Sequence, residues 1–595
     1  MSTPRIHRRR RTMASTGTTS GTGAGTGSRI AVALLAVAAF VPTACSSSGS
    51  STSASTSAST SGNAAGTTAG TAPSASTSPT ESSTAGTAAQ RPGCTRPAAD
   101  PVSAQPVAGV TSDFDIPSFD GTIIRAHWFP LPSAAADTPA PTILMGPGWG
   151  SGGDTNVDAA GLLGALSIGT LRTAGYNVLT WDPRGFGVSS GTVTIDSADH
   201  EGLDVGRLLD WVAAQPQAAL DNSGDPRVGM VGASYGGGIQ LVTAAIDCRV
   251  DAIVPIIAWH SLITSLFKSD TAKTGWAGVL TLASAGRKLD PTIDRTNAAS
   301  KATGVIDPAD KAWFADRGPG DLVGKITAPT LLIQGTVDTL FTLDEAVTNY
   351  RILHDAGVPV SMLWFCGGHG ICLTKQGDAS RTAKAAIAWL NRYVKDDATV
   401  STGPRFEFID QDGAGYTAPD YPVAAGAAVT AEGSGTLSLV ADGGAGPVTS
   451  TSTGSILDAI VPPITPARAT NAVNVSIVAP ATTAIIVGAP ELTITYSGTT
   501  PDGQRPTRVF AQLVDDATGI VLGNQITPIA VTLDGQPHTV TVPLEMVAFT
   551  FRPDTSLTLQ IVATTVAYAQ PRLGGSVTLT SVSVKLPTAT GVTPM

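Results

Sequence analysis

Charged side chains are scarce in this chain: only 14% of its 595 residues are Asp, Glu, Lys or Arg. The formal net charge is −10, and basic residues cluster only at the extreme N-terminus. Since a surface that holds phosphates needs clustered Lys and Arg, this distribution argues against a nucleic-acid partner. The 42% of hydrophobic residues suffice for a large interior, and the length indicates two or more domains.

Cofactor signatures are also missing from the sequence. It has no metal-ligand spacing, no phosphate-binding loop and no dinucleotide-binding fingerprint. Functions that depend on such groups are not indicated, and we expect neither a metal nor another cofactor.

The N-terminus has the pattern of a targeting segment. Residues 5–11 are mostly basic, and residues 30–41 form an apolar run too short for a stable membrane span. Cys45 follows in Val-Pro-Thr-Ala-Cys, which resembles a bacterial lipobox except that Pro42 stands where Leu is usual. We therefore expect residues 1–45 to be the signal peptide of an exported protein, a cell-surface lipoprotein held to the membrane through Cys45. An ordinary cleaved signal and a secreted protein are the alternative.

Cysteine usage fits an oxidising compartment. If Cys45 carries lipid, four of the five cysteines remain, and an even number suits two disulfides. Connectivity does not follow from sequence, but we predict a local bond between Cys366 and Cys372 and a long-range bond between Cys94 and Cys248. Four buried thiols are the alternative.

Composition then separates a linker from a folded α/β part. Residues 46–92 are almost entirely Ser, Thr, Ala and Gly, and we assign residues 46–100 to a disordered linker. Strands and helices alternate over residues 101–398, which indicates an α/β fold with a mostly parallel central sheet. Within it, residues 259–325 look helical and rich in loops. We expect an inserted cap over the site there, with a plain surface excursion as the alternative.

Hydrophobic periodicity predicts the elements of the α/β part. A hairpin turns at Asp120-Gly121. Buried strands are predicted at 141–145, 176–181, 227–231, 252–257, 330–333 and 360–365. Helices are predicted at 159–174, 200–214, 239–246, 343–356 and 381–394.

The last part, residues 399–595, has a different hydrophobic pattern and composition. Helical periodicity is absent, and short runs rich in Val, Thr and Ile recur between Gly, Pro, Asp and Asn. This pattern predicts an all-β sandwich or jelly roll.

The clearest chemical signal is Gly232-Ala233-Ser234-Tyr235-Gly236. It follows a predicted strand and opens a predicted helix, which is the context of a nucleophile elbow. The glycines permit close backbone packing around a strained turn, and the helix N-terminus offers N–H groups to a developing oxyanion. We predict that Ser234 is a nucleophile.

A serine hydroxyl needs a base, and His369 is the best placed of the seven histidines. It lies in Cys-Gly-Gly-His-Gly, directly after the last predicted strand of the α/β part. Asp338 follows the preceding strand in Gly-Thr-Val-Asp and would orient the histidine. The order Ser234, Asp338, His369 is that of α/β-hydrolases and differs from chymotrypsin and subtilisin. Asp344 and Glu345 are explained as acids at a helix N-terminus.

An oxyanion hole requires a second donor besides the residue after the nucleophile. We predict the backbone N–H groups of Tyr235 and of Trp149, which lies in Gly-Trp-Gly after the strand at 141–145. A merely flexible turn is the alternative for this glycine-rich loop. We assign Asp182 and Arg184 to a structural turn.

Together these residues resemble a known family. Residues 105–395 look like the Xaa-Pro dipeptidyl-peptidases (peptidase S15) and cocaine-esterase-like hydrolases, through Phe-Asp-Gly-Thr at 119–122, Asp-Pro-Arg-Gly-Phe-Gly at 182–187 and the three catalytic motifs. The tail is similar to that family's C-terminal jelly-roll, galactose-binding-like domain. The resemblance implies acyl transfer to water through an acyl-enzyme on the same triad. Esterases of the group use a tyrosine side chain in the oxyanion hole, whereas this chain has Gly-Pro-Gly-Trp-Gly there.

Three functions stay open at this point. The first is a serine peptidase that releases dipeptides with Pro or Ala as the penultimate residue, which requires a site for the free amine of the substrate. The second is an esterase or acyltransferase that acts on small or envelope esters. The third is a surface protein whose β domain binds carbohydrate while the hydrolase part is inert, which the intact triad argues against.

Overall fold

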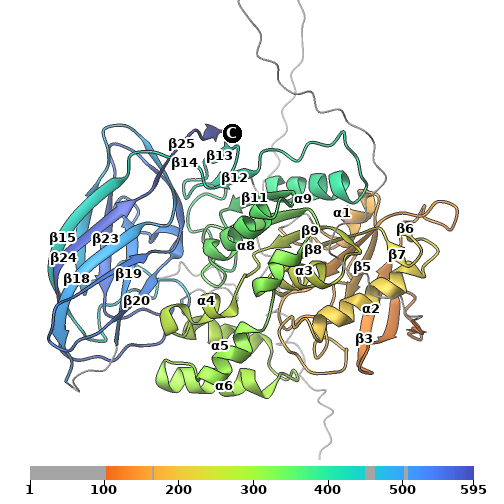
Figure 1. Cartoon of the computed structure of the whole chain (residues 1–595), viewed down its shortest axis with the longest axis horizontal. Helices are drawn as coiled ribbons and strands as arrows, with labels where there is room; N and C mark the ends of the chain where they lie inside the picture. Colours follow the sequence, from red (N-terminus) through yellow and green to blue (C-terminus); the bar gives the residue numbers. More distant parts are fainter. Residues whose placement is uncertain (1–101, 164–165, 379, 449–461, 502–506) are drawn as a thin grey trace, which may run out of the picture.

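The computed structural model shows a helical part built around a central sheet, and a strand-built part beside it (Figure 1). The expected signal peptide and linker, with Cys45 and Cys94, lie outside the described residues. No helix in the described ranges is long and apolar enough to cross a membrane. The structure describes residues 102–163, 166–378, 380–448, 462–501 and 507–595.

A twelve-stranded sheet forms the centre of the helical part. The strand pairs from β5 to β12 are parallel, and a hairpin adds antiparallel strands at one edge. Every residue of β4, β5, β8 and β10 is buried, which explains their largely apolar sequences. The predicted hairpin and six buried strands are all present. In spatial order the strands are β1 (Gln105–Pro106), β2 (Asp113–Pro117), β3 (Ile123–Phe129), β5 (Asn177–Trp181), β4 (Thr142–Gly146), β8 (Val228–Ala233), β9 (Val250–Ile256), β10 (Thr330–Gly335), β11 (Val360–Phe365), β12 (Phe406–Ile409), β13 (Gly415–Ala418) and β26 (Thr593–Pro594).

Helices cover both faces of this sheet. Buried side chains of α2, α3 and α8 share a core with one face, and those of α1 and α9 share a core with the other. The helix predicted at 159–174 is shorter than expected, because α1 begins after Ser167, whose side chain forms a capping box with Thr170. A Cβ at Gly161 would lie 1.9 Å from the Leu166 carbonyl oxygen, so the chain makes a tight turn there instead. These helices are α1 (Ile168–Thr173), α2 (Glu201–Ala213), α3 (Tyr235–Ile246), α8 (Leu343–Asp355) and α9 (Ser380–Tyr393).

Residues 259–325, the cap, leave the sheet after β9 and return to it at β10. Two of its helices begin at Asp-Pro pairs: Asp290 and Asp307 accept backbone N–H groups, and Pro291 and Pro308 take the first helical positions. Figure 1 shows α4, α5 and α6 together at one end of the sheet. The cap consists of α4 (Leu262–Leu266), α5 (Thr274–Ala283), α6 (Pro291–Thr303), α7 (Pro308–Ala315) and the 3₁₀ segments η2 (Lys268–Asp270) and η3 (Gly320–Lys325).

Two antiparallel four-stranded sheets face each other in the strand-built part, which we call the β part. Their inward side chains share one core, in which Ile494 and Leu559 from opposite sheets are fully buried. The first sheet runs β15 (Val429–Ser438), β24 (Ser576–Leu586), β18 (Glu491–Thr499), β21 (His538–Pro543); the second runs β16 (Ala472–Val478), β23 (Ser556–Val562), β19 (Thr507–Asp515), β20 (Thr527–Val531). Smaller elements are the sheet β14 (Ala424–Ala425), β25 (Thr588–Thr590), β17 (Ala484–Gly488), β22 (Val547–Phe551), the pair β6 (Leu220–Asn222) and β7 (Asp225–Pro226), and η4 (Leu522–Asn524).

The central sheet extends past the predicted boundary at residue 398. β12 pairs in parallel with β11, β13 follows it, and β26 at the C-terminal end of the chain pairs with β13. Helical periodicity is lost after α9, but a buried strand after a helix still continues the alternation of the α/β part. The tail therefore leaves the central sheet only after β13 and rejoins it at β26.

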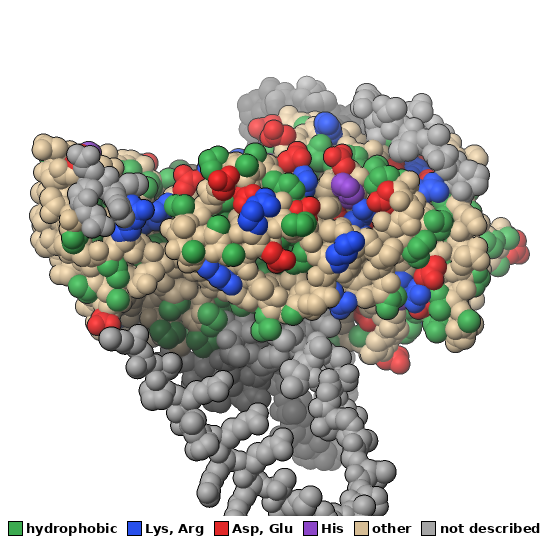
Figure 2. Space-filling view, turned by 90° about the horizontal axis from the view of Figure 1, so that it is seen from below, with side chains coloured by type: hydrophobic (Ala, Val, Ile, Leu, Met, Phe, Trp, Pro, Cys, Tyr) green, Lys and Arg blue, Asp and Glu red, His purple; other side chains and the backbone are tan. Residues whose placement is uncertain are grey.

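Charges of both signs are interspersed on the face that Figure 2 shows. Lys311 and Asp270 form one exposed ion pair of the cap. A face of this kind presents no continuous positive field to a polyanion.

Candidate active site

Ser234 stands on the sharp turn between β8 and α3. Its backbone has φ 57° and ψ −117°, a conformation that residues other than glycine rarely adopt. A Cβ at Gly232 would lie 2.6 Å from the Gly236 carbonyl oxygen, and one at Gly236 would lie 2.2 Å from that of Gly146. The glycines of the motif are therefore required by the close backbone packing that holds the strained serine.

The serine hydroxyl, an imidazole and a carboxylate form one hydrogen-bonded chain. Ser234 Oγ lies 2.8 Å from His369 Nε2, and His369 Nδ1 lies 2.7 Å from Asp338 Oδ2. Ser234 and His369 are only 7% and 9% exposed, and Asp338 is fully buried. The structure thus brings together the three residues predicted from the sequence, in a geometry suited to base-assisted nucleophilic attack.

Parallel strand pairing explains why the acid and the base meet. β10 and β11 pair in register from Thr330 with Val360 to Gly335 with Phe365. Their carboxyl ends lie side by side, and β9 separates them from β8, which leads to the serine turn. Ligand sites of open α/β sheets gather at this edge of the sheet.

The loop that carries the acid, residues 338–341 (the acid loop), folds back on its own carboxylate. Asp338 Oδ1 accepts hydrogen bonds from the N–H groups of Leu340 and Phe341 at 3.0 and 2.8 Å. Its other oxygen, Oδ2, accepts from the backbone N–H of His369 at 3.1 Å as well as facing the imidazole. These bonds fix the direction of the carboxylate toward the base.

Two other parts of the fold hold the acid loop from outside. Gln525 Nε2 of the β part donates to the Asp338 carbonyl at 2.7 Å, and Lys273 Nζ of the cap donates to the Leu340 carbonyl at 2.9 Å. Burial lowers the pKa of Lys273 to about 8, although the carboxylate of Glu545 opposes this shift. Gln525 and Lys273 belong to no motif, and sequence reasoning missed both of them.

The loop that carries the base, residues 366–372 (the histidine loop), is closed by a disulfide. Cys366 and Cys372 are bonded, as predicted. Cys248 is disulfide-bonded as well, and its predicted partner Cys94 lies outside the described residues. The bond joins Cys366, directly after β11, to Cys372, three residues after His369. It therefore restricts the movement of the histidine loop.

Aromatic rings and the β part position the imidazole further. Trp276 and Phe341 lie edge-on to the His369 ring, with centroids at 5.6 and 5.1 Å. Asn524 Nδ2 of the β part donates to the Ile371 carbonyl at 2.9 Å. The segment that contains Gln525 thus contacts both the acid loop and the histidine loop through neighbouring side chains.

The predicted oxyanion donors come from the start of α3 and from the loop after β4. The N–H of Tyr235 belongs to the first turn of α3, where backbone N–H groups have no acceptor within the helix. Within the described ranges, neither this N–H nor that of Trp149 donates to a protein acceptor. The indole N–H of Trp149 instead binds the Leu280 carbonyl at 3.0 Å, and its ring packs edge-on against Phe186 and Tyr235.

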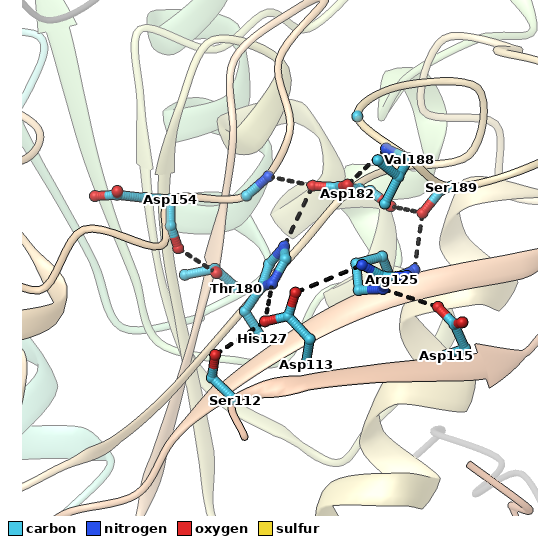
Figure 3. A network of polar contacts seen from close by, with 12 residues as sticks. Ser112, Asp113, Asp115, Arg125, His127, Asp154, Thr180, Asp182, Val188 and Ser189 are labelled. Carbon is cyan, nitrogen blue, oxygen red and sulfur yellow. Dashed lines mark hydrogen bonds and ion pairs between the residues drawn. The ribbon is translucent and has the colours of Figure 1, made fainter. Parts of the chain in front are cut away.

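A buried network holds the loop of Trp149 in place (Figure 3). Asp182 accepts N–H groups from Gly153 of that loop and from Val188, both at 2.8 Å. His127 bridges the carboxylates of Asp113 and Asp182 at 2.9 and 3.4 Å. Burial opposes a charge on His127, but hydrogen bonds to the two carboxylates outweigh it and raise the pKa of His127. Asp182 is thus part of a structural turn, the role expected for it.

A buried acidic group lies at the far end of the Tyr235 ring. The phenol donates to Glu201 at 3.4 Å and accepts from the backbone N–H of Asp196 at 3.4 Å. Burial, with a smaller contribution from the charge of Glu201, raises the pKa of Asp196 well above its ordinary value. These contacts fix the side chain of the residue whose N–H is the predicted oxyanion donor, and sequence reasoning missed them.

A cavity opens beside Ser234 under the cap. Its wall is mostly apolar and comes from the serine turn, the acid loop and helices α4 to α7. Lys273 and Asp294 are the charged residues among those that line it. A cavity of this kind accommodates a small-molecule substrate.

Several known proteins share this architecture. A family model described as X-Pro dipeptidyl-peptidase (S15 family) matches residues 120–371. A CocE/NonD family hydrolase from Staphylococcus aureus aligns with a TM-score of 0.59 at 11% identity, over 84% of this chain and 99% of that one. An aminopeptidase from the marine sediment archaeon Thaumarchaeota archaeon gives 0.61 at 12%, over 84% and 99%, and an α-amino acid ester hydrolase gives 0.57 at 12%, over 85% and 98%. No curated protein matches the chain.

At these identities the solved structures show the fold alone, an α/β-hydrolase core with a large, mostly sheet C-terminal region. The matched family stretch contains Ser234, Asp338 and His369. The resemblance predicted from the sequence is thereby confirmed. The chain is an enzyme, a serine hydrolase of peptidase or esterase type, and its residues 120–371 are similar to the S15 peptidase family.

Proposed function

We propose that Ser234, His369 and Asp338 act as a catalytic triad that transfers an acyl group to water. His369 Nε2 takes the proton of Ser234 Oγ as the oxygen attacks the substrate carbonyl, and returns it to the leaving group. Asp338 orients the imidazole and stabilises its charged form. The N–H groups of Tyr235 and Trp149 receive the oxyanion. Water then attacks the acyl-enzyme with the same base, and the acid product leaves.

One observation carries this proposal: the unbroken chain from Ser234 Oγ through His369 to the buried Asp338, with links of 2.8 and 2.7 Å. The stability of the fold does not require a serine in a strained turn to hydrogen-bond to a base. It is the arrangement that activates a hydroxyl.

Labelling with a fluorophosphonate probe tests the triad. We expect the probe to label the folded protein at Ser234, and Ser234→Ala to abolish the label. Ser581→Ala is the matched control, since Ser581 lies exposed on β24 of the β part. Unlabelled but folded wild-type protein, or a label that persists in Ser234→Ala, contradicts the proposal.

Ester hydrolysis is the activity that the cavity favours over the dipeptidyl-peptidase activity implied by the resemblance. A dipeptidyl-peptidase needs an anion for the free amine of its substrate. Asp294 is the one carboxylate among the residues that line the cavity, and it is exposed on α6. Esters of uncharged acyl groups have no such need, and an acyltransferase would share their acyl-enzyme.

An assay of Ala-Pro and Gly-Pro anilides beside short acyl esters separates the two activities. We expect turnover of the esters, with much slower turnover of the anilides. If the anilides are the better substrates and Asp294→Asn raises their KM, the dipeptidyl-peptidase assignment holds instead. Turnover of esters alone rejects it.

We further propose that the protein is exported and held at the outer face of the cell membrane by a lipid on Cys45. The basic segment, the short apolar run and the small residues before Cys45 support this. Labelling of cells with a fatty-acid analogue should mark the wild-type chain and leave Cys45→Ala unmarked. A secreted, unlabelled wild-type chain favours the ordinary signal peptide.

The β part is proposed to be a jelly roll. Strand order β15-β24-β18-β21 against β16-β23-β19-β20 supports it, because two interlocked Greek keys give such a crossed order. Carbohydrate binding by this part, as in galactose-binding-like domains, is tested by a glycan array with the whole protein. A blank array argues for a purely structural domain.

A further inference from the structure

The cavity beside Ser234 is walled by one face of each of two cap helices. On α5 the lining residues are Ala277, Leu280 and Thr281, spaced by three and four positions. On α6 they include Ile293 and Asn297, again four positions apart. Residues at these spacings lie on one side of a helix, so both helices turn a continuous stripe toward the cavity.

These stripes leave apolar side chains without a full set of packing partners. Leu266, Leu280 and Ile293 are only half-buried although they lie within the cap. Half-buried branched aliphatic side chains around a cavity expose apolar surface to water, which is unfavourable. An apolar occupant would remove that cost.

The charged groups of the wall do not suit a charged or peptide-like occupant. The ammonium of Lys273 donates to the Leu340 carbonyl of the acid loop, and Asp294 is exposed. A peptide group or a charge placed against Leu266, Leu280 or Ile293 would lose its hydration without gaining a partner from these side chains. A hydrocarbon chain has no polar or charged group whose hydration would be lost.

The wall is also fixed to the reacting centre. Asn297 Nδ2 binds Thr281 Oγ1 at 2.6 Å and ties α6 to α5. The Leu280 carbonyl of α5 in turn accepts the indole N–H of Trp149, on the predicted oxyanion loop. The cavity is therefore continuous with Ser234 and built on a frame that includes the oxyanion side of the site.

From this geometry we propose that the cavity is an acyl-chain site, and that the substrates are esters of aliphatic carboxylic acids of medium length, about six to twelve carbons. This rests on the function proposed above. The chain lies between α5 and α6 while Ser234 Oγ bonds to the carbonyl carbon. The ester C–O bond breaks, and the alcohol leaves with the proton from His369. Water then releases the fatty acid and restores the serine.

The extent of the wall supports chains of that length. Its lining residues run from Ser234 past Leu280 to Ile293, so a short acyl group would leave most of the apolar wall exposed to water. Each methylene buried against the wall improves binding by about fourfold at most, because apolar transfer scales with buried area. The benefit ends when the chain reaches the end of the cavity.

The test is a chain-length series of p-nitrophenyl esters from acetate to hexadecanoate, each below its solubility limit. We expect kcat/KM to rise by about two- to fourfold per methylene up to eight to twelve carbons and then to fall. Ile293→Trp and Ala277→Trp fill the cavity and should move the optimum of the chain-length series to four carbons or fewer. Leu282→Trp is the matched control: Leu282 also lies on α5 but is 55% exposed and does not line the cavity.

The outcomes distinguish this proposal from the one on which it rests. A profile that is flat or highest at acetate, in protein that the fluorophosphonate labels at Ser234, overturns the acyl-chain site and leaves the triad intact. Absence of labelling overturns the triad itself. If both tryptophan variants lose acetate turnover, inhibition of the wild type decides: decanoate should compete with p-nitrophenyl acetate far better than propionate, and equal inhibition by the two rejects the proposal.

Discussion

The two sides of Ser234 are built in opposite ways. Toward His369, polar groups are paired, buried and tied to several parts of the fold. Toward the cap, half-buried aliphatic side chains such as Leu280 and Ile293 surround an open volume. The polar side has one arrangement for the reacting groups, whereas the apolar side has room for different occupants. In the proposed mechanism the reaction type is set on one side of the serine and the substrate choice on the other.

The two sides also differ in which parts of the chain build them. The cavity wall comes mainly from the cap, a single insertion in the α/β sequence. The acid loop is held by the sheet, the cap and the β part, the last through Gln525. This contrast indicates that the β part helps to position the acid of the proposed triad.

The sharpest test of the polar side removes the charge of the acid. Asp338→Asn keeps the shape but can no longer accept the imidazole N–H in the same way, and we expect kcat for the best ester to fall about 10⁴-fold. Steady-state kinetics and the rate of fluorophosphonate labelling measure the loss. Asp344→Asn, a nearby acid on α8 paired with Lys268, should change kcat by less than about threefold. Equal losses in the two variants would show that charge in general, and not the triad, matters here.

Opening the histidine loop should have the next largest effect. In Cys366→Ser/Cys372→Ser the seven-residue loop loses its covalent closure, and His369 can move away from Ser234. Because small displacements of a catalytic group are costly, we expect kcat to fall about ten- to a hundredfold with KM little changed. The double variant is preferred to a reductant, which would also attack the disulfide of Cys248. An unchanged kcat would mean that the aromatic rings and Asp338 position the imidazole without help from the disulfide.

Support from the β part should be measurable but smaller. Gln525→Leu removes the hydrogen bond to the Asp338 carbonyl, and we expect kcat to fall about three- to tenfold while the chain-length profile stays unchanged. Arg508→Met breaks a contact between the β part and the cap, at the Asp270 carbonyl, without touching a catalytic loop. A similar fall in both variants would assign the effect to loosening of the interface and not to the acid loop.

The polar side was largely predictable from the sequence, because its residues carry local signals. Ser234 lies in a glycine-flanked elbow, and Asp338 and His369 follow buried strands, so chain order and strand ends were enough to bring them together. The apolar buried strands were predictable for a related reason: a strand covered on both faces has few polar residues. The helix expected at 159–174 was too long because its spacing gave no sign of the turn at Gly161.

The remainder of the site depends on contacts between segments far apart in the chain. Gln525 and Lys273 act through single hydrogen bonds to backbone carbonyls, and any Gln or Lys near a loop would look the same in sequence. β12 and β26 are short, and only pairing with β11 and β13 reveals that they belong to the hydrolase sheet. The residues of the cavity wall have the same helical spacing as an ordinary packed face. The cavity is therefore recognisable only once the helices of the cap are assembled.

The smallest effect on activity is expected at the edge of the polar side, in the network of Figure 3. His127 lies between Asp113 and Asp182 and its pKa is raised, so the charged form stabilises the fold. That contribution is complete below the ordinary histidine pKa of about 6.5 and is lost as the pH rises through the higher folded-state value. His127→Gln should therefore lower the free energy of unfolding at pH 5, by about 1–3 kcal/mol, and the gap to wild type should narrow above pH 6.5.

Urea unfolding of the two proteins at pH 5, 6.5, 8 and 9 measures this gap. His354→Gln is the control, since His354 is more exposed and lies on α8, away from the network. A gap that is constant over this range would mean that His127 acts as a neutral packing group. In that case Asp182 alone holds the loop of Trp149, through Gly153.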